Sequence, residues 1–235
     1  MPVQPLPNRL LTTARWPVGV AATSWAYIWR TTPMHRRELE GSLDRDGPPP
    51  LPDGVSLDGV QRPEHGAGPL LRRRYRARIR DTATGPTDLM SRLTGDPDQV
   101  APGELAKFSK TSGEEGVMRV GDEFLVRMPG PWDGPIRVVE VTPESFRFAT
   151  LDGHLEAGQI EWRAGRDEDG LLTFEIESWA RSGDAVSHLL HNHLRMAKEV
   201  QLHMWTSVLE RVARLVGGRL TGGIDIETHR ADFPE

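Results

Sequence analysis

Residues 184–216 read DAVSHLLHNHLRMAKEVQLHMWTSVLERVARLV, and this stretch predicts one long amphipathic helix. Its apolar side chains recur every three or four residues, which places them on one helical face. They are Val186, Leu189, Leu190, Leu194, Ala197, Val200, Met204, Trp205, Val208, Val212 and Leu215. Ser182 or Asp184 is suited to cap the start, and the glycines that follow Val216 are suited to end the helix. At a rise of about 1.5 Å per residue the helix is about 50 Å long, so it needs an extended apolar surface to pack against.

The segment before this helix supplies such a surface, because strand patterns dominate it. The predicted strands are 71–80, 117–128, 136–142, 145–151, 159–164 and 171–181, with turn residues between them. The connections are short, which favours antiparallel neighbours. Two short helices, 86–93 and 102–109, are predicted after the first strand. The fold class is therefore α+β, with a curved antiparallel sheet of about six or seven strands around the long C-terminal helix.

The first strand carries an unusual ladder of arginines. A period of two places Arg72, Arg74, Arg76, Arg78 and Arg80 on one face, and Leu71, Arg73, Tyr75, Ala77 and Ile79 on the other. Five like charges in a row repel one another, so we expect acidic residues beside them. Glu175 and Glu177 in the strand 172–181 fit this role if the two strands pair. The alternative is a stripe that binds an anionic ligand or nucleic acid, which the net charge of −5 disfavours.

Proline and glycine divide the chain into four parts. Residues 1–43 are predicted as an N-terminal helical extension, 44–69 as a Pro/Gly-rich linker, 70–218 as the main domain and 219–235 as a loose C-terminal tail. The extension holds a helix at 18–30 and a more charged turn at 34–43. Its aromatic residues are Trp16, Trp25, Tyr27 and Trp29. They dock the extension on the main domain, or alternatively form a lid over a pocket or an interfacial membrane contact.

Composition excludes several classes of protein. The 235 residues contain no cysteine, which rules out disulfides and thiolate metal sites. The net charge of −5 argues against a general nucleic-acid binder. The longest apolar run, 16–29, is interrupted and too short to cross a bilayer, and no signal-peptide cleavage site follows it. We predict a cytoplasmic protein without a transmembrane segment, and the sequence does not indicate an oligomeric state.

Two local motifs resemble those of a known family. Gly153-His154-Leu155-Glu156-Ala157-Gly158, followed by Glu161-Trp162, is similar to a Gly-His-x-Glu-x-Gly motif in an uncharacterised bacterial domain-of-unknown-function family. The strand 174–181, FEIESWAR, resembles the same family's Phe-x-Ile-x-Ser strand, with alanine at 180 where serine is more usual. That family lies in the SRPBCC superfamily (START and pollen-allergen-like proteins). The resemblance implies a helix-grip fold over about 70–218, with a cavity between sheet and helix, and no established activity.

Few residues suggest catalysis. The sequence has no nucleophile elbow, phosphate loop, dinucleotide fingerprint or His-Glu-x-x-His helix. His154 and Glu156 are weak candidates for a general acid/base pair, but equally they can tie the backbone of a turn together. Glu199 and His203 share a helical face, yet neighbouring cations would repel a metal ion, so we predict no metal site and no cofactor. These absences favour a protein that is not an enzyme.

Our main hypothesis is a binding protein for a small apolar or amphipathic molecule enclosed between sheet and helix. The predicted cavity walls include Phe124, Val126, Met128, Phe148, Trp162, Phe174 and Trp179. The predicted ligand-binding residues are Arg127, Trp132, Trp162, Glu177, Trp179, Arg181 and Met204. One alternative is a cyclase- or hydrolase-like enzyme that uses His154 and Glu156. Another is a non-enzymatic interaction module whose core is filled by side chains.

Overall fold

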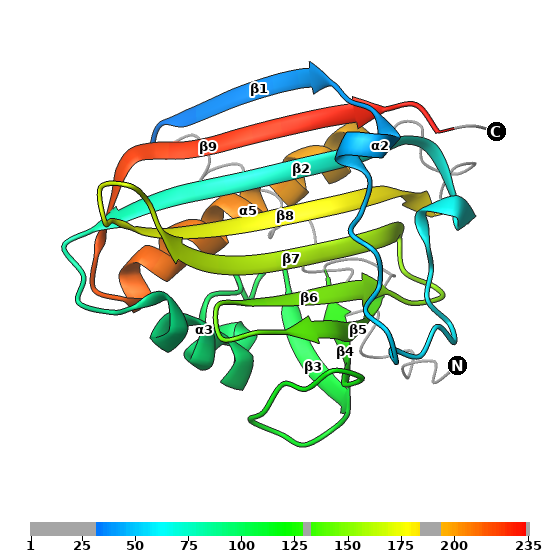
Figure 1. Ribbon diagram of the computed structural model, residues 1–235, viewed down its shortest axis with the longest axis horizontal. Coiled ribbons are helices and arrows are strands. Elements are labelled where there is room, and N and C mark those ends of the chain that lie inside the picture. Colours follow the sequence, from blue (N-terminus) through cyan, green and yellow to red (C-terminus); the bar gives the residue numbers. More distant parts are fainter. Residues whose placement is uncertain (1–31, 129–132, 184–193, 234–235) are drawn as a thin grey trace.

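The computed structural model describes residues 32–128, 133–183 and 194–233, and in these residues nine strands form a single sheet. The strands are β1 Met34–Glu40, β2 Gly66–Arg80, β3 Lys107–Ser112, β4 Glu123–Arg127, β5 Asp133–Val141, β6 Ser145–Thr150, β7 Glu156–Arg166, β8 Leu172–Gly183 and β9 Arg219–Ala231. Their order across the sheet is β1-β9-β2-β8-β7-β6-β5-β4-β3, antiparallel throughout except for the parallel pair β1–β9. The helix α5 (Leu194–Leu215) runs behind the strands in Figure 1. We call the face that packs against α5 the helix side and the opposite face the outer side.

The part of the sheet from β3 to β8, together with β2, corresponds to the predicted domain. Helix α3 (Pro86–Gly95) and the short 3-10 helix η2 (Pro97–Gln99) follow β2. The second predicted helix, 102–109, is wrong, because β3 begins at Lys107. The predicted pairing of β2 with β8 is confirmed, with Tyr75 opposite Ile176. The strand count of six or seven is wrong for the whole sheet, since β1 and β9 extend it at one edge.

Helix α5 ends as its sequence predicts. Gly217 adopts a positive φ of 65°. The N–H of Gly218 donates to the carbonyl of Ala213 at 2.9 Å, and the N–H of Gly217 donates to that of Arg214 at 3.0 Å, which is a Schellman ending. Ser182 lies within β8 and does not cap the helix, while the predicted first turns, 184–193, lie outside the described residues.

Both ends of the described chain differ from the prediction. Residues 219–231, predicted as a loose tail, form β9, which pairs with β2 and β1. Residues 34–40, predicted as a helical turn, form the edge strand β1. The predicted helix at 18–30 and its tryptophans lie outside the described residues.

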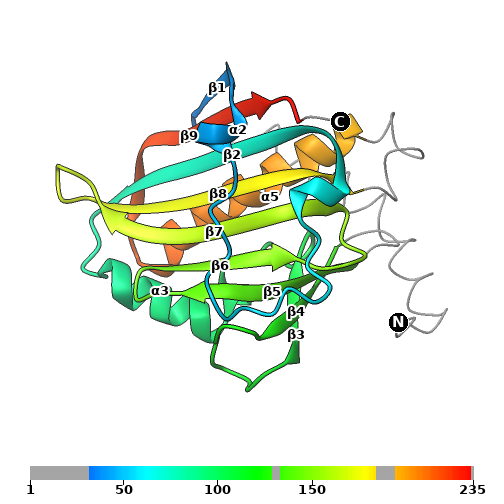
Figure 2. The ribbon, with the colours of Figure 1, turned by 45° about the vertical axis from the view of Figure 1, so that its right-hand side comes forward.

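The predicted linker is a packed segment rather than a loose connection. After helix α2 (Leu43–Asp46), residues 47–62 cross the outer side of the sheet as a strap, visible in front of the strands in Figures 1 and 2. Buried side chains hold it, since Gln159 Nε2 donates to the Pro49 carbonyl at 3.0 Å and Arg147 donates to the Pro50 carbonyl at 3.3 Å. Val60 packs in a small apolar cluster with Val139, Ala149 and Leu151. The strap therefore covers strands that would otherwise expose apolar residues to water.

The main core lies between the helix side of the sheet and α5. Tyr75, Ala77 and Ile79 of β2 are buried there, as the alternation in sequence predicts. The aromatic cluster at its centre contains Phe108, Phe124, Phe146, Phe148, Trp162, Phe174 and Trp205, with ring centroids 5.2–6.5 Å apart. The buried stripe of α5 also includes Leu202, Leu209 and Ala213, which the sequence analysis left out.

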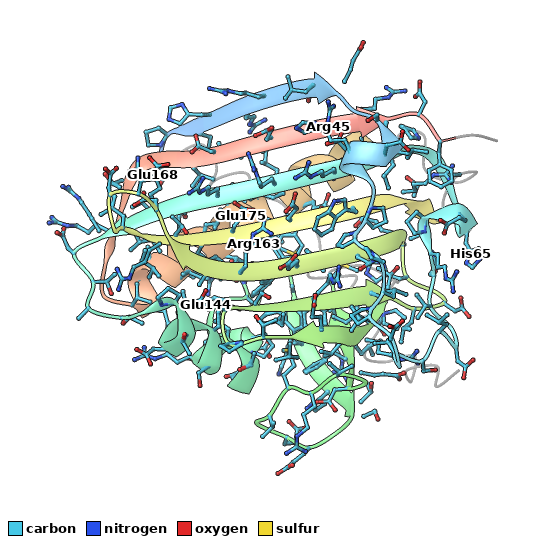
Figure 3. The ribbon with its side chains drawn as sticks, viewed as in Figure 1. Arg45, His65, Glu144, Arg163, Glu168 and Glu175 are labelled. Atoms are coloured by element: carbon cyan, nitrogen blue, oxygen red, sulfur yellow. The ribbon has the colours of Figure 1, made fainter. Side chains whose placement is uncertain are left out.

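The arginine ladder lies on the outer side, among carboxylates. Arg72 bridges Glu177 at 2.6 Å and Asp46 at 2.9 Å, and Arg163 bonds to both Glu175 and Glu177. Figure 3 shows Arg163 and Glu175 side by side on the face turned away from α5. The prediction of a salt-bridged outer face with Glu175 and Glu177 in it is therefore confirmed. Glu227 of β9, which the sequence pattern did not indicate, also takes part and pairs with Arg74 at 2.6 Å.

Asp46 anchors α2 to this network, and its titration gives a first prediction. Burial alone would raise its pKa, but hydrogen bonds from the Ser42 N–H, Arg72 and Arg45 outweigh burial and lower the pKa from 3.8 to about 2. The ionised carboxylate therefore stabilises the fold above about pH 4, and this contribution is lost as the pH falls towards 2. We expect Asp46→Asn to be less stable than the wild type by about 1–2 kcal/mol at pH 6.

The difference between wild type and Asp46→Asn should shrink between pH 4 and pH 2, because the wild-type carboxylate becomes protonated in that range. Urea denaturation at a series of pH values measures the free energy of unfolding of both proteins. Asp44→Asn is a suitable control, because Asp44 lies in the same helix but is exposed. A difference that does not change with pH would contradict the assignment.

Candidate functional site

The predicted ligand-binding residues do not gather at one place. Trp162 and Met204 lie in or against the main core on the helix side. Glu177, Trp179 and Arg181 all point to the outer side of β8, where Trp179 stands opposite Arg72 and Gln159. The assignment of Trp179 to the cavity wall is therefore wrong.

The remaining candidates lie apart from both groups. Arg181 donates to the carbonyls of Gly68 at 2.7 Å and Pro63 at 2.8 Å, and its guanidinium lies 4.0 Å from the ring centroid of Phe233. These contacts fasten η1 (Pro63–His65), the start of β2 and Phe233 to β8. Arg127 is exposed at the end of β4, and Trp132 lies outside the described residues.

The side chains of His154 and Glu156 are not hydrogen-bonded to each other. The backbone nitrogen and carbonyl oxygen of Glu156 lie 2.9 and 3.0 Å from Nδ1 of His154, so the ring is held by the backbone of Glu156 and not by its carboxylate. Burial lowers the pKa of His154, which favours the neutral ring. The ring packs over Gly134, where an added Cβ would come within 2.9 Å of Nε2. The interpretation that this motif ties a turn together fits these contacts better than catalysis.

The carboxylate of Glu156 instead points to helix α5. Gln201 Nε2 donates to its two oxygens at 3.3 and 3.2 Å. The oxygen of the same amide accepts a hydrogen bond from the guanidinium of Arg73. We call Arg73, Glu156 and Gln201 the polar corner, because they join β2, β7 and α5 at one end of the helix side.

Trp205 follows Gln201 by one helical turn and connects the polar corner to the aromatic interior. Its ring contacts that of Trp162 edge to face, with centroids 6.1 Å apart. The side chain is 9% exposed, and in the described residues its buried Nε1–H has no hydrogen-bond acceptor. Buried donors in native proteins nearly always have a partner, so this N–H marks a position where an acceptor belongs.

The middle of the interface between sheet and helix is filled by side chains in the described part of the chain. Trp162 is 1% exposed and meets four aromatic neighbours. Two surface hollows occur instead beside α3 and the end of α5, one lined by Ala83, Thr84, Asp88, Ser91 and Arg92, the other by Gln99, Arg211, Arg214 and Leu215. The described residues therefore leave little room for a ligand beside Trp162.

The described residues contain neither a grouping of metal ligands nor a helix that could cross a membrane. No three or more His, Asp or Glu side chains there are grouped so that they could hold a metal ion. In the same residues no helix has the length and hydropathy needed to cross a bilayer. The cytoplasmic location stays a prediction.

Comparison with known proteins gives one family match. Residues 101–211, a little less than half of the chain, match a family model described as Domain of unknown function (DUF1990). The matched range contains both motifs on which the resemblance in sequence rests, 153–162 and 174–181. No curated protein matches the chain.

Solved structures with a similar arrangement are distant in sequence. The ginseng major latex-like protein 151 from Panax ginseng is 16% identical, with 63% of this chain and 99% of that chain covered and a TM-score of 0.44. Ara h 8.0201 is 10% identical, with 62% and 99% covered and a TM-score of 0.42. The di-domain ARO/CYC StfQ from the steffimycin biosynthetic pathway is 10% identical, with 63% and 51% covered and a TM-score of 0.48. These likenesses do not decide what this chain binds.

Two residues of the polar corner were missed by the sequence analysis. Arg73 carries a recognisable signal, since it is the charged member of the otherwise apolar set Leu71, Tyr75, Ala77 and Ile79. Gln201 carries none, because a glutamine next to apolar helix positions is ordinary. Only the packing of α5 on the sheet shows that it reaches β2 and β7.

Proposed function

We propose that the protein binds a small amphipathic molecule beside Trp205, where the polar corner meets the aromatic interior, and that it does so without catalysis. The observation that carries this proposal is the buried Nε1–H of Trp205, which lacks an acceptor in the described residues. A buried donor without a hydrogen bond costs about 1–3 kcal/mol, so a ligand that supplies an acceptor at this position would bind more tightly by a similar free energy.

Both parts of an amphipathic molecule have suitable surroundings there. The apolar part would pack against Trp205 and the neighbouring aromatic rings, where burial stabilises by about 25 cal/mol per Å². The polar part would meet the side chains of Arg73 and Gln201, which already bond to each other. Ligand sites typically combine such an apolar wall with a few fixed polar groups.

Binding of 1-anilinonaphthalene-8-sulfonate (ANS) to the folded protein tests the proposal. ANS combines an aromatic body with a polar head, and its fluorescence reports the apolar contact. We expect saturable binding to one site, and a dissociation constant that rises about fivefold in Trp205→Phe, which keeps the ring and removes the N–H. Native mass spectrometry of the purified protein, followed by denaturing extraction, identifies any molecule that it retains.

Trp179→Phe is the matched control. It makes the same chemical change in a buried tryptophan, but on the outer side of β8, and should leave the dissociation constant within about twofold. Near-UV circular dichroism confirms that each variant is folded, since ANS also binds partly unfolded proteins. Absence of saturable binding, or equal effects of the two variants, would contradict the proposal.

The packed aromatic cluster around Trp162 favours a second candidate, an interaction module whose interior is closed. This candidate predicts a protein that retains no small molecule and does not bind ANS while folded. The same titration therefore separates the two candidates. A cyclase- or hydrolase-like activity has less support, because the side chains of His154 and Glu156 bond to different partners.

A further inference from the structure

We propose that the polar head bound at this corner is an anion, and that the guanidinium of Arg73 binds it. The inference rests on the proposed function and specifies its ligand class: a single-chain amphiphile with a carboxylate or similar oxyanion at one end. Three observations about the corner support it, namely the partners of Arg73, the order of residues along the sheet, and the balance of donors and acceptors.

Arg73 differs from the ion-paired arginines of β2 in its partners and in the side of the sheet that it faces. On the outer side, Arg72, Arg74 and Arg78 each bond to at least one carboxylate. Arg73 points to the helix side, and in the described residues its hydrogen-bond partner is the neutral amide of Gln201. The guanidinium is half-buried there, so its charge is only partly solvated. A half-buried cation without a carboxylate partner favours a bound anion.

The register of the strands places Arg73 next to the aromatic interior. Tyr75, Ile176 and Trp162 lie side by side across β2, β8 and β7. The adjacent row on the helix side contains Arg73, together with Ser178 and Ile160. An apolar chain that packs against the aromatic rings would therefore bring its head group directly to Arg73.

Glu156 is the negatively charged residue of the polar corner, and it would favour a cationic head group. It pairs with Ser182, two helix-side rows further from the aromatic interior than Arg73. Its two carboxylate oxygens already accept hydrogen bonds from the side-chain amide of Gln201. A head group in contact with the apolar interior thus meets the guanidinium first and the carboxylate only beyond Gln201.

Hydrogen-bonding capacity at the corner is also unbalanced. A guanidinium has five N–H donors, and in the described residues that of Arg73 uses one acceptor, the oxygen of Gln201. The Nε1–H of Trp205 adds another donor. A carboxylate or sulfonate supplies only acceptors, and a guanidinium matches its two oxygens geometrically. Gln201 acts as a positioning residue, because its amide oxygen fixes the guanidinium.

Decanoate and decanol test the inference, because they share an apolar chain and differ in the charge of the head. Isothermal titration calorimetry at sub-micellar concentrations gives both dissociation constants. We expect the wild type to bind decanoate at least about tenfold more tightly than decanol. Arg73→Gln should remove this preference by weakening decanoate binding at least about tenfold, with decanol changed less than about threefold.

Arg76→Gln is the matched control, since Arg76 lies on the same strand but faces the outer side, and it should leave both constants unchanged within about twofold. Equal binding of decanol and decanoate by the wild type would overturn the anion inference and leave the proposed function intact. Tighter binding of decylamine than of decanoate would overturn the anion inference and indicate a cationic head group bound by Glu156. Failure of all three to bind would overturn the proposed function itself. The wild-type comparison stands even if Arg73→Gln does not fold.

Discussion

Trp162→Ala is expected to lower the free energy of unfolding by about 3–5 kcal/mol. The indole is 1% exposed and lies at the centre of the aromatic cluster. Its ring centroid is 5.4 Å from that of Phe146, 6.0 Å from that of Phe174, and 6.1 Å from those of Phe108 and Trp205. Alanine would remove the contacts between sheet and helix and leave a cavity that rigid neighbours cannot close. Urea denaturation measures the loss.

Two variants show whether the loss comes from packing. Trp162→Phe retains much of the ring and should lose less stability than Trp162→Ala. Val120→Ala removes apolar atoms from a side chain that is 51% exposed, and should change the free energy of unfolding by no more than about 0.5 kcal/mol. A loss below about 1 kcal/mol for Trp162→Ala would show that the interior is loosely packed, which would favour the wide cavity of the original hypothesis.

Prediction from the sequence succeeds for strands that have one face in the apolar core and the other among polar groups or water. In β2, Tyr75 is buried and Arg74 pairs with a carboxylate, so the alternation of side chains is strong. The edge strand β1 shows no such alternation, because its residues after Met34 are all exposed. A charged strand at a sheet edge therefore looks like a charged turn in sequence.

Strand β9 was missed because of two glycines inside it. Gly222 and Gly223 were interpreted as a break, yet both have positive φ and lie where the register between β2 and β9 shifts. On one side of the shift Ala77 pairs with Ile224, and on the other Arg78 pairs with Thr221. Glycines at such an irregularity let the strand continue in a new register, so they mark a bulge as readily as an end.

The candidate site was only partly predictable. A strand pattern shows which side chains share a face, but it does not show which residues of other elements lie beside them. Phe174 and Trp179 are five positions apart in β8, so an uninterrupted strand must turn them to opposite faces. Strict use of that alternation would have excluded Trp179 from the cavity wall. The link from Arg73 through Gln201 to Glu156 joins residues far apart in sequence, and it depends on how α5 is placed on the sheet.

Arg72→Met is the second substitution with a large expected effect, and it acts on the opposite side of the sheet from Trp162. Arg72 joins two carboxylates that are almost completely buried, Asp46 at 1% and Glu177 at 2% exposure of the side chain. Removing the guanidinium leaves Glu177 with Arg163 and Asp46 with Arg45, which compensate these poorly solvated charges only in part, so we expect a loss of about 2–4 kcal/mol in the free energy of unfolding. The loss should appear in urea denaturation at pH 7, together with easier proteolysis of the strap, because Asp46 fastens α2 to β2.

Arg74→Met separates burial from simple loss of charge. Arg74 lies on the same strand and face as Arg72, but it and its partner Glu227 of β9 are 37% and 27% exposed, so this pair should contribute less than about 1 kcal/mol. The carboxylate that has lost one of its two guanidinium partners is the source of the larger loss, and Glu177→Gln should therefore recover part of it in the Arg72→Met background. Equal losses for Arg72→Met and Arg74→Met, or no recovery in the double variant, would contradict the assignment of the loss to the buried charges.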